Sequence, residues 1–394
     1  KIWDVVIEDY RNGYSVTSAP LIVKDMVLIG VGGGEYGIRG FLDAYSIDDG
    51  KRLWRFHTIP GAGEPGNETW EGDSWKTGGA PTWLSGSYDP ASNLLYWGTG
   101  NPGPLYQGDY RTGDNLYSDS VLALNPDTGE LQWYFQFTPH DEHDWDSNQI
   151  PVLVDRPWKG KQRSLLLWPN RNGFFYVIDR LSGEFLAATA YAKQNWAERI
   201  DENGRPVVIE SARPTPQGAV VFPAPQGASN WQSPTYSPRT DLLYVPAIDG
   251  GRIVFNQEDE IEHSPGAPFH GSMHQLISKD KPFLTTVRAI RPDTGDIAWE
   301  YQNPRRNIHW KAGGLLSTAG DIVFGGDGKN LFILNAGDGT ELWRVNVGGY
   351  VNAVPVTYAV DGQQRLTMAA GRSLFTFGLA ESASADLAEA HNDN

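Results

Sequence analysis

The segment ALNPDTGELQW, residues 123–133, recurs along this chain and sets its architecture. Three further copies read AYSIDDGKRLW at 44–54, AIRPDTGDIAW at 289–299 and ILNAGDGTELW at 333–343. In each copy a strand leads into a tight turn that ends in glycine, and a second strand carries a tryptophan. The copies predict β-hairpins, and the tryptophans expected to pack between neighbouring sheets are Trp54, Trp133, Trp299 and Trp343.

Short apolar strands also recur between the hairpins, and no long segment keeps a helical period. Many short strands with Gly-rich turns, at a repeat length near ~40–50 residues, are typical of a β-propeller of four-stranded blades. The sequence thus predicts an all-β chain that forms a single propeller domain over residues 1–394. A β-sandwich or a solenoid is the alternative. Long loops are expected at about 189–230 and 250–285, and loops of this kind often cover a site.

Composition excludes several classes of protein. The 394 residues include 32 Lys and Arg against 48 Asp and Glu, a formal net charge of −16, so nucleic acid is not an expected partner. The chain has no cysteine, which excludes thiolate metal sites and thiol nucleophiles. No stretch of the sequence approaches the roughly 18 apolar residues that a membrane-spanning helix needs.

The motifs between the hairpins are more specific than the hairpins. They read ETWEGDSWK at 68–76, GTGNP at 98–102, TPHDEHD at 138–144 and NRNG at 170–173. With these motifs the chain resembles the pyrroloquinoline-quinone (PQQ) dehydrogenases nearly from end to end, in the order found in methanol and ethanol dehydrogenases. The resemblance implies an eight-bladed propeller that oxidises alcohols in the bacterial periplasm. It also implies that the first blades are missing, because Lys1 falls well inside the propeller of a family member.

The resemblance places one hard cation at Glu35, Asn101 and Asp144, beside the quinone. Glycines precede both Glu35 and Asn101, so the backbone can approach a buried ion or cofactor closely. All these donors are oxygens, which suits a hard cation rather than zinc. Asp144 also matches the catalytic base of the family.

Asp146 is expected to select the metal. In extended backbone, residues i and i+2 project to the same side, so Asp144 and Asp146 should face one point. Asp146 matches the extra carboxylate of the lanthanide-dependent branch, whereas calcium-dependent members tend to have a small uncharged residue there. A trivalent ion takes one more anionic ligand than a divalent ion, so a lanthanide is favoured, with calcium as the alternative. The alternative is that Asp144 and Asp146 have no role in metal binding and belong to a solvated acidic loop.

The resemblance also implies a PQQ site. Trp83 matches the tryptophan that forms the floor under the quinone ring. Arg171 matches the arginine at the reactive quinone oxygens, where a planar cation can stabilise developing negative charge. The remaining implied contacts come from Thr17 to a quinone carboxylate, from the backbone of Gly33 and Gly34, and from Trp310 at the cofactor edge.

The implied reaction passes hydride from a small alcohol to PQQ, while Asp144 takes the hydroxyl proton and a cytochrome c receives the electrons. A homodimer is compatible with the resemblance. The rival hypothesis is a non-catalytic scaffold, because propellers with the same docking hairpins also serve in outer-membrane assembly. Such a scaffold has no reason to keep Glu35, Asn101, Asp144 and Arg171 together.

Overall fold

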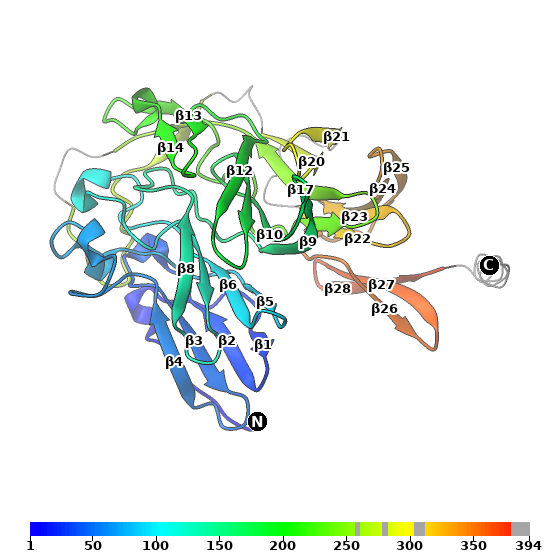
Figure 1. The fold of residues 1–394 in the computed structure, drawn as a ribbon, viewed down its shortest axis with the longest axis horizontal. Helices are drawn as coiled ribbons and strands as arrows, with labels where there is room; N and C mark the ends of the chain where they lie inside the picture. The colour runs from blue at the N-terminus through cyan, green and yellow to red at the C-terminus, as the bar shows by residue number, and fades with distance from the viewer. Residues whose placement is uncertain (257–260, 278–282, 303–311, 380–394) are drawn as a thin grey trace. The chain divides into compact units, whose positions relative to one another are not determined.

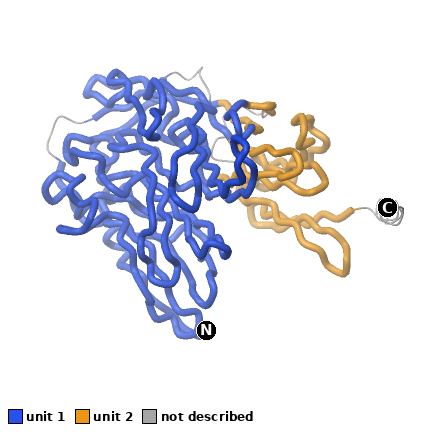
Figure 2. Tube along the Cα trace, in the orientation of Figure 1, with its two compact units in different colours: residues 1–231, 247–283, 291–296 blue, residues 232–246, 284–290, 297–394 orange. Residues whose placement is uncertain are grey.

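The computed structural model describes residues 1–256, 261–277, 283–302 and 312–379. Within these ranges the chain forms antiparallel β-sheets and short 3₁₀ helices (Figure 1). It divides into two compact units, coloured separately in Figure 2. Unit 1 comprises residues 1–231, 247–283 and 291–296, and unit 2 comprises residues 232–246, 284–290 and 297–394.

Three four-stranded sheets follow one another along unit 1, each in sequence order. The first comprises β1 (Leu21–Val23), β2 (Met26–Gly30), β3 (Phe41–Ser46) and β4 (Arg52–His57). The second comprises β5 (Ser87–Asp89), β6 (Leu94–Gly98), β7 (Ser120–Leu124) and β8 (Leu131–Gln136). The third comprises β9 (Val152–Trp158), β10 (Lys161–Pro169), β11 (Phe174–Asp179) and β12 (Phe185–Ala190).

Further sheets follow in the C-terminal part of the chain. One comprises β16 (Thr235–Ser237), β17 (Leu242–Asp249), β20 (Leu284–Ile290) and β21 (Ile297–Gln302). The next comprises β22 (Leu316–Ser317), β23 (Ile322–Asp327), β24 (Asn330–Asn335) and β25 (Glu341–Asn346). A three-stranded sheet comprises β26 (Val356–Val360), β27 (Gln363–Ala370) and β28 (Ser373–Gly378).

The segments expected as long loops contain short strands of their own. In unit 1, β13 (Ala197–Ile200) pairs with β14 (Pro206–Val208), and β15 (Ala219–Val221), β18 (Arg252–Val254) and β19 (His274–Leu276) form a small sheet. The 3₁₀ helices are η1 (Tyr10–Asn12), η2 (Gly34–Tyr36), η3 (Asn67–Thr69), η4 (Ser74–Thr77), η5 (Gly108–Arg111) and η6 (Glu210–Ala212). In the described ranges no helix has the length and apolar character to cross a membrane.

The hairpins predicted from the repeat are present with a common register. Ala123 pairs with Trp133 between β7 and β8, and Ala289 pairs with Trp299 between β20 and β21. A β-bulge lies next to each pair. The repeated sequence therefore produces the same local backbone each time, because turn length and strand alternation set the register.

Three of the hairpin tryptophans pack onto a turn glycine of the following sheet. A Cβ added to Gly129 would lie 2.6 Å from the Trp54 ring, and Trp54 Nε1 donates to Pro126 O at 2.8 Å. Gly129 has a φ of +74°, which favours glycine, and the nearby Trp54 ring leaves no room for a Cβ, so both the backbone conformation and the packing require glycine. The same contact joins Trp133 to Gly183 and Trp299 to Gly339.

Two other tryptophans depart from the expected pattern. Trp343 is 39% exposed, with its ring edge-to-face with Phe377, so the expected burial between blades is wrong for this residue. The other tryptophans pack onto the hairpin between the third and fourth strands of the following sheet. In the described ranges the sheet that follows Trp343 has three strands, so such a hairpin is not found in that part of the chain. Trp3, which the repeat analysis did not include, packs on Gly50 and donates to Ile47 O at 2.8 Å.

The middle sheet of unit 1 buries both of its faces. In β7, Val121 belongs to a core cluster with Trp168 of the third sheet, whereas Leu122 belongs to one with Leu42 of the first sheet. Because successive side chains of a strand point to opposite faces, β7 contributes to both clusters. This packing confirms the prediction of consecutive four-stranded blades in an all-β chain.

Candidate active site

The described site residues lie on connections at one edge of the unit 1 sheets. Glu35, Asn101 and Arg171 follow β2, β6 and β10, which are the second strands of the three sheets. Trp83 and Asp144 lie after β4 and β8, which are the fourth strands. In an antiparallel four-stranded meander, the second and fourth strands end at the same edge. Strand order thus carries residues far apart in the sequence to the same edge.

Asp146 is the carboxylate with the largest set of partners at this edge. It is 5% exposed. Its Oδ1 accepts from Asn101 N at 2.7 Å, and its Oδ2 accepts from Trp83 Nε1 at 3.1 Å. Its Oδ2 also forms an ion pair with Arg171 Nη1. Asp146 therefore links the connections after β4, β6, β8 and β10.

Asp144 reaches the same cation by a different backbone path from the one expected. Its φ is +65°, in the left-handed region, so the assumption of extended backbone is wrong here. The two carboxylates nevertheless converge, because Arg171 Nη2 lies 3.6 Å from Asp144 Oδ2. Burial raises the pKa of Asp144 well above its usual range; Arg171 opposes that rise, and the charges of Asp146 and Glu35 add to it.

Arg171 is the buried cation between the two aspartates. Besides the carboxylates, its Nη2 donates to Asp144 O at 2.6 Å and to Pro225 O. Burial acts to lower the pKa of Arg171, but the charges of Asp146 and Asp144 outweigh it, so the pKa lies above its usual range. Its Nε is buried with no hydrogen-bond partner in the described part of the chain. A buried N–H of this kind leaves one donor for a bound anion or carbonyl.

Asn101 and Gly34 are close neighbours, whereas Glu35 lies on the surface. Asn101 is buried, and its Nδ2 donates to Pro102 O at 3.1 Å. A Cβ on Gly34 would lie 2.5 Å from Asn101 Oδ1, so only glycine fits there. Glu35, in η2, is exposed and makes no side-chain hydrogen bond to any residue in the described part of the chain, although its charge contributes to the raised pKa of Asp144.

The residues expected at the quinone are only partly brought together. Trp83 is half-buried, and exposed Thr17 contacts it through a hydrogen bond from Oγ1 to Trp83 O at 3.1 Å. Gly33 is buried with a φ of +126°. Trp310 falls outside the described residues.

Sequence reasoning missed Asp141, and it expected the 189–230 segment to cover a site without naming the residues that contact it. Asp141 accepts the backbone N–H groups of His143 and Trp145, on either side of Asp144. Trp145 Nε1 donates to Ala224 O at 3.1 Å, next to the Pro225 that Arg171 contacts. The signal for Asp141 was its place in a loop after Pro139, where aspartate commonly caps nearby amides.

The residues present suit a hard cation and a planar anionic cofactor. The donors are carboxylate and amide oxygens, which hard cations prefer. Gly34 and Gly100 bring backbone against Asn101 Oδ1 and Asp146 Oδ1, at positions that a Cβ would fill. In the described ranges, no group of three His, Asp or Glu side chains is arranged so that it could hold a metal ion. In this structure Arg171 is the cation that Asp144 and Asp146 share.

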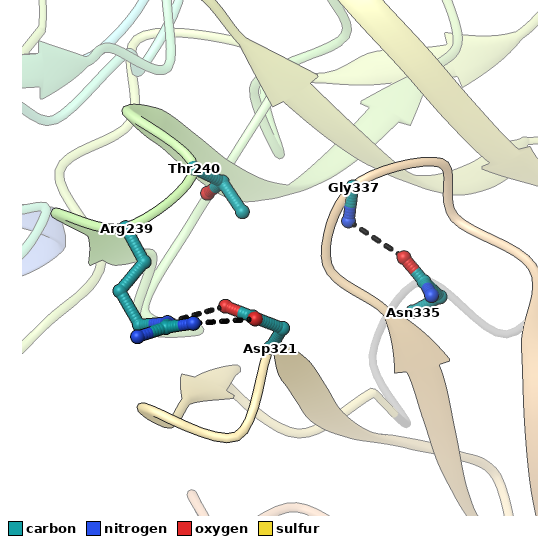
Figure 3. A pocket seen from close by; sticks show the side chains of 5 residues that line it. All are labelled: Arg239, Thr240, Asp321, Asn335 and Gly337. Carbon is teal, nitrogen blue, oxygen red and sulfur yellow. Dashed lines mark hydrogen bonds and ion pairs between the residues drawn. The ribbon is translucent and has the colours of Figure 1, made fainter. Parts of the chain in front are cut away.

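An open cavity of about 530 Å³ lies elsewhere, in unit 2. Figure 3 shows its lining residues, with Arg239 paired to Asp321 by two hydrogen bonds of 2.8 and 3.0 Å. Asn335 Oδ1 accepts from Gly337 N at 2.8 Å. These polar groups satisfy one another, and every described residue of the predicted site belongs to unit 1.

Comparison with known proteins identifies the family. A family model described as "PQQ: Glucose/ethanol/alcohol dehydrogenase, beta-propeller domain" matches residues 3–194 and 188–366. The quinoprotein alcohol dehydrogenase PedH of Pseudomonas putida is 37% identical over 94% of this chain and 65% of that protein. A lanthanide-dependent methanol dehydrogenase of Methylorubrum extorquens is 34% identical over 94% of this chain and 66% of that protein.

Solved structures agree in fold. The quinohemoprotein alcohol dehydrogenase ADHIIG of Pseudomonas putida superimposes with a TM-score of 0.86 at 34% identity, over 93% of this chain and 57% of that one. A europium-containing methanol dehydrogenase gives a TM-score of 0.82 at 33% identity, over 92% of this chain and 66% of that one. The chain thus spans about half to two thirds of the length of these relatives. The β-propeller prediction is confirmed, and the chain belongs to the PQQ-dependent alcohol dehydrogenase family.

Proposed function

We propose that this chain holds PQQ and a metal ion at the Asp144–Asp146–Arg171 cluster and oxidises small alcohols to aldehydes. The observation that carries the proposal is the convergence of Asp144 and Asp146 on one buried arginine. A scaffold has no use for two carboxylates held this close, since each raises the cost of ionising the other. The names of the relatives, which include alcohol and methanol dehydrogenases, favour the enzyme over the scaffold.

Asp144 is the proposed general base. It is half-buried, so an alcohol hydroxyl can reach it, and its raised pKa makes it a stronger proton acceptor than an exposed aspartate. Arg171 keeps the residue in place, because its Nη2 lies near the carboxylate and also donates to Asp144 O. Bound PQQ would supply the hydride-accepting carbonyl, and a bound metal would supply Lewis acidity.

A lanthanide is the proposed metal, with Glu35, Asn101, Asp144 and Asp146 as its ligands. Support comes from the Asp144 and Asp146 carboxylates, which meet at Arg171, whereas Glu35 is exposed and is a proposed ligand on the family resemblance alone. A trivalent cation is better matched by three carboxylates than calcium is. The lanthanide-dependent methanol dehydrogenases among the relatives agree with this choice, and calcium is the alternative.

Further parts of the proposal concern the setting. A cytochrome c is the proposed electron acceptor, because a chain with a net charge of −16 attracts a basic partner. The proposed location is the bacterial periplasm, and a homodimer is the proposed assembly. Mixing with a cytochrome c at rising ionic strength tests the charge argument, since a steered encounter slows steeply with salt.

The test of the function is the Asp144→Asn variant. It keeps an oxygen donor and nearly the same volume, so PQQ and metal contents, measured by absorbance and mass spectrometry, should match the parent. Turnover of alcohol should fall by ~10²–10⁴-fold, because the proton acceptor is lost. Full turnover in this variant, at full PQQ and metal content, would refute the assignment of the base.

The matched control is Asp89→Asn. Asp89 is also a buried aspartate that pairs with a buried arginine, through Oδ2 and Arg180 Nε at 3.0 Å. It is the last residue of β5, next to the turn that leads to β6, at the opposite edge from the site. This variant should lose stability and keep the turnover of each PQQ-loaded molecule.

A further inference from the structure

The backbone of the proposed base is held in an unfavourable conformation. Asp144 has a φ of +65°, in the left-handed region that residues with a side chain seldom adopt. Left to itself, such a residue returns to negative φ, and this rotation would turn its carboxylate away from Arg171. Some neighbouring group must therefore hold the segment.

One group that contacts the backbone of this segment on both sides of Asp144 is the Asp141 carboxylate. Its Oδ1 accepts from His143 N at 3.0 Å, and its Oδ2 accepts from Trp145 N at 2.9 Å. These are the two amides on either side of Asp144, so one carboxylate spans the strained residue. Asp141 is only 1% exposed, which protects both hydrogen bonds from water.

Asp141 is itself anchored from behind. Arg111, which is fully buried, donates through Nη2 to Asp141 O and through Nη1 to Asn115 Oδ1 at 2.8 Å. Asn115 in turn donates to Arg111 O at 2.7 Å. The backbone of Asp141 is therefore fixed by Arg111, so its carboxylate stays in place as an acceptor for the amides of residues 143 and 145.

We propose that Asp141 is a positioning residue that holds the Asp144 carboxylate in its reactive orientation, an inference that rests on the proposed function. Asp141 acts through the amides of residues 143 and 145, and its Oδ1 also lies 3.7 Å from His143 Nδ1. Both of its oxygens point at backbone N–H groups, so it serves neither as a base nor as a ligand. Its role is to keep Asp144 pointed at Arg171 and at an incoming alcohol.

Two substitutions of Asp141 should reduce the support of Asp144 to different extents. Asp141→Asn keeps one acceptor oxygen but turns an NH₂ toward the second amide, so one of the two hydrogen bonds is lost. Asp141→Ala loses both. A misplacement of about 1 Å costs up to ~10²-fold in rate, so we expect kcat to fall about tenfold in Asp141→Asn and about 10²-fold in Asp141→Ala. KM for the alcohol and the PQQ and metal contents should stay near the parent values.

Hydrogen exchange provides a readout that does not depend on activity. The amides of His143 and Trp145 should exchange at least about tenfold faster in Asp141→Asn than in the parent, since each buried hydrogen bond is worth about 1 kcal/mol or more. Asp89→Asn is the control: Asp89 Oδ1 also caps a backbone amide, that of Ala91, at 3.0 Å. Its exchange increase should be confined to residues 89–93, with kcat unchanged.

The outcomes separate this proposal from the proposed function. Faster exchange at residues 143 and 145 together with a lower kcat and intact PQQ and metal contents supports the positioning role. Unchanged exchange at these amides, or a kcat equal to that of the parent, overturns it. If the PQQ- and metal-loaded parent oxidises no alcohol, the proposed function fails, and hydrogen exchange alone then decides whether Asp141 braces Asp144. Should Asp141→Ala fail to fold, Asp141→Asn carries the same test.

Discussion

Removing the guanidinium of Arg171 should destabilise the metal-free protein. A lanthanide ion should then restore stability, because it supplies the positive charge that Asp144 and Asp146 have lost. In Arg171→Ala, the buried carboxylate of Asp146 loses its ion-pair partner, and Asp144 loses the cation 3.6 Å from its Oδ2. Two carboxylates then share a site with no positive charge between them. The carbonyls of Asp144 and Pro225 also lose their donor.

The size of the effect follows from burial. Breaking a buried ion pair by removing one partner costs about 3–5 kcal/mol, so the free energy of unfolding at neutral pH should fall by that amount. The pKa of Asp144, already raised by burial, should rise further without the arginine. A carboxylate whose folded-state pKa lies above its unfolded value weakens the fold at high pH, so the deficit should shrink as the pH falls toward ~4.

The assay is urea unfolding with and without a lanthanide ion. At a free metal concentration of about 100 times Kd, binding to the folded state alone adds about 2.7 kcal/mol. Arg171 repels a trivalent ion, and each ~1.4 kcal/mol of relieved repulsion strengthens binding about tenfold. We therefore expect lanthanide to stabilise Arg171→Ala more than it stabilises the parent.

The control is Arg180→Ala, because Arg180 is a buried arginine paired with Asp89 and Asp155, remote from the proposed ligands. It should lose stability and gain no extra stabilisation from the metal. The reasoning is refuted if the two variants respond alike to lanthanide, or if Arg171→Ala is as stable as the parent without metal. Either result would mean that Arg171 and the ion do not share carboxylates.

Three further predictions address the metal, the pH dependence and the blades. Asp146→Ala should weaken lanthanide-supported activity more than calcium-supported activity, and equal losses in assays with each metal would contradict a selecting role. Burial, together with nearby Arg39 and Arg55, lowers the pKa of His57 from 6.5 to about 4, so the free energy of unfolding should drop as the pH falls through this window. His57→Phe should flatten that slope in unfolding measured from pH 7 to 4, and an unchanged slope would count against the assignment. Trp54→Ala should lower the free energy of unfolding by about 3 kcal/mol. Gly129→Ala should cost less stability in the Trp54→Ala protein than in the parent, because the added methyl group then no longer clashes with the Trp54 ring. If thermal unfolding shows that the two losses simply add, direct packing of Trp54 on Gly129 is refuted.

Local repetition allowed the hairpins and the four-stranded blades to be predicted from the sequence. The hairpin motif depends on short-range physics: a turn of defined length, a glycine at positive φ and alternation along the strands. These requirements lie within about eleven residues, so they are visible in the sequence of each copy. The exception, Trp343, shows the limit, because the packing of a tryptophan depends on the neighbouring sheet and not on its own hairpin.

The site was predicted only in part, and the reason is geometric. The identities of Asp144, Asp146 and Arg171 were predicted from motifs, and the structure brings them together. The backbone that does so was predicted wrongly, since a φ of +65° at Asp144 cannot be inferred from a run of polar residues. Glu35 lies exposed on η2, although its motif placed it with the other acidic residues.

The amino-acid sequence was sufficient for the blade repeat, because the repeat depends on residue types at short separations, whereas the residues of the candidate site were predicted through a family resemblance. Tertiary structure decided which atoms meet. The ion pair of Arg171 with Asp146 joins residues 25 positions apart, and the hydrogen bond from Trp83 to Asp146 joins residues 63 apart. Contacts of this kind form only when sheets pack face to face and their connections gather at one edge, and no local pattern encodes that distance. Asp141 illustrates the difference: its side chain is an ordinary loop aspartate in the sequence, and only the folded loop shows that it holds the two amides that flank Asp144.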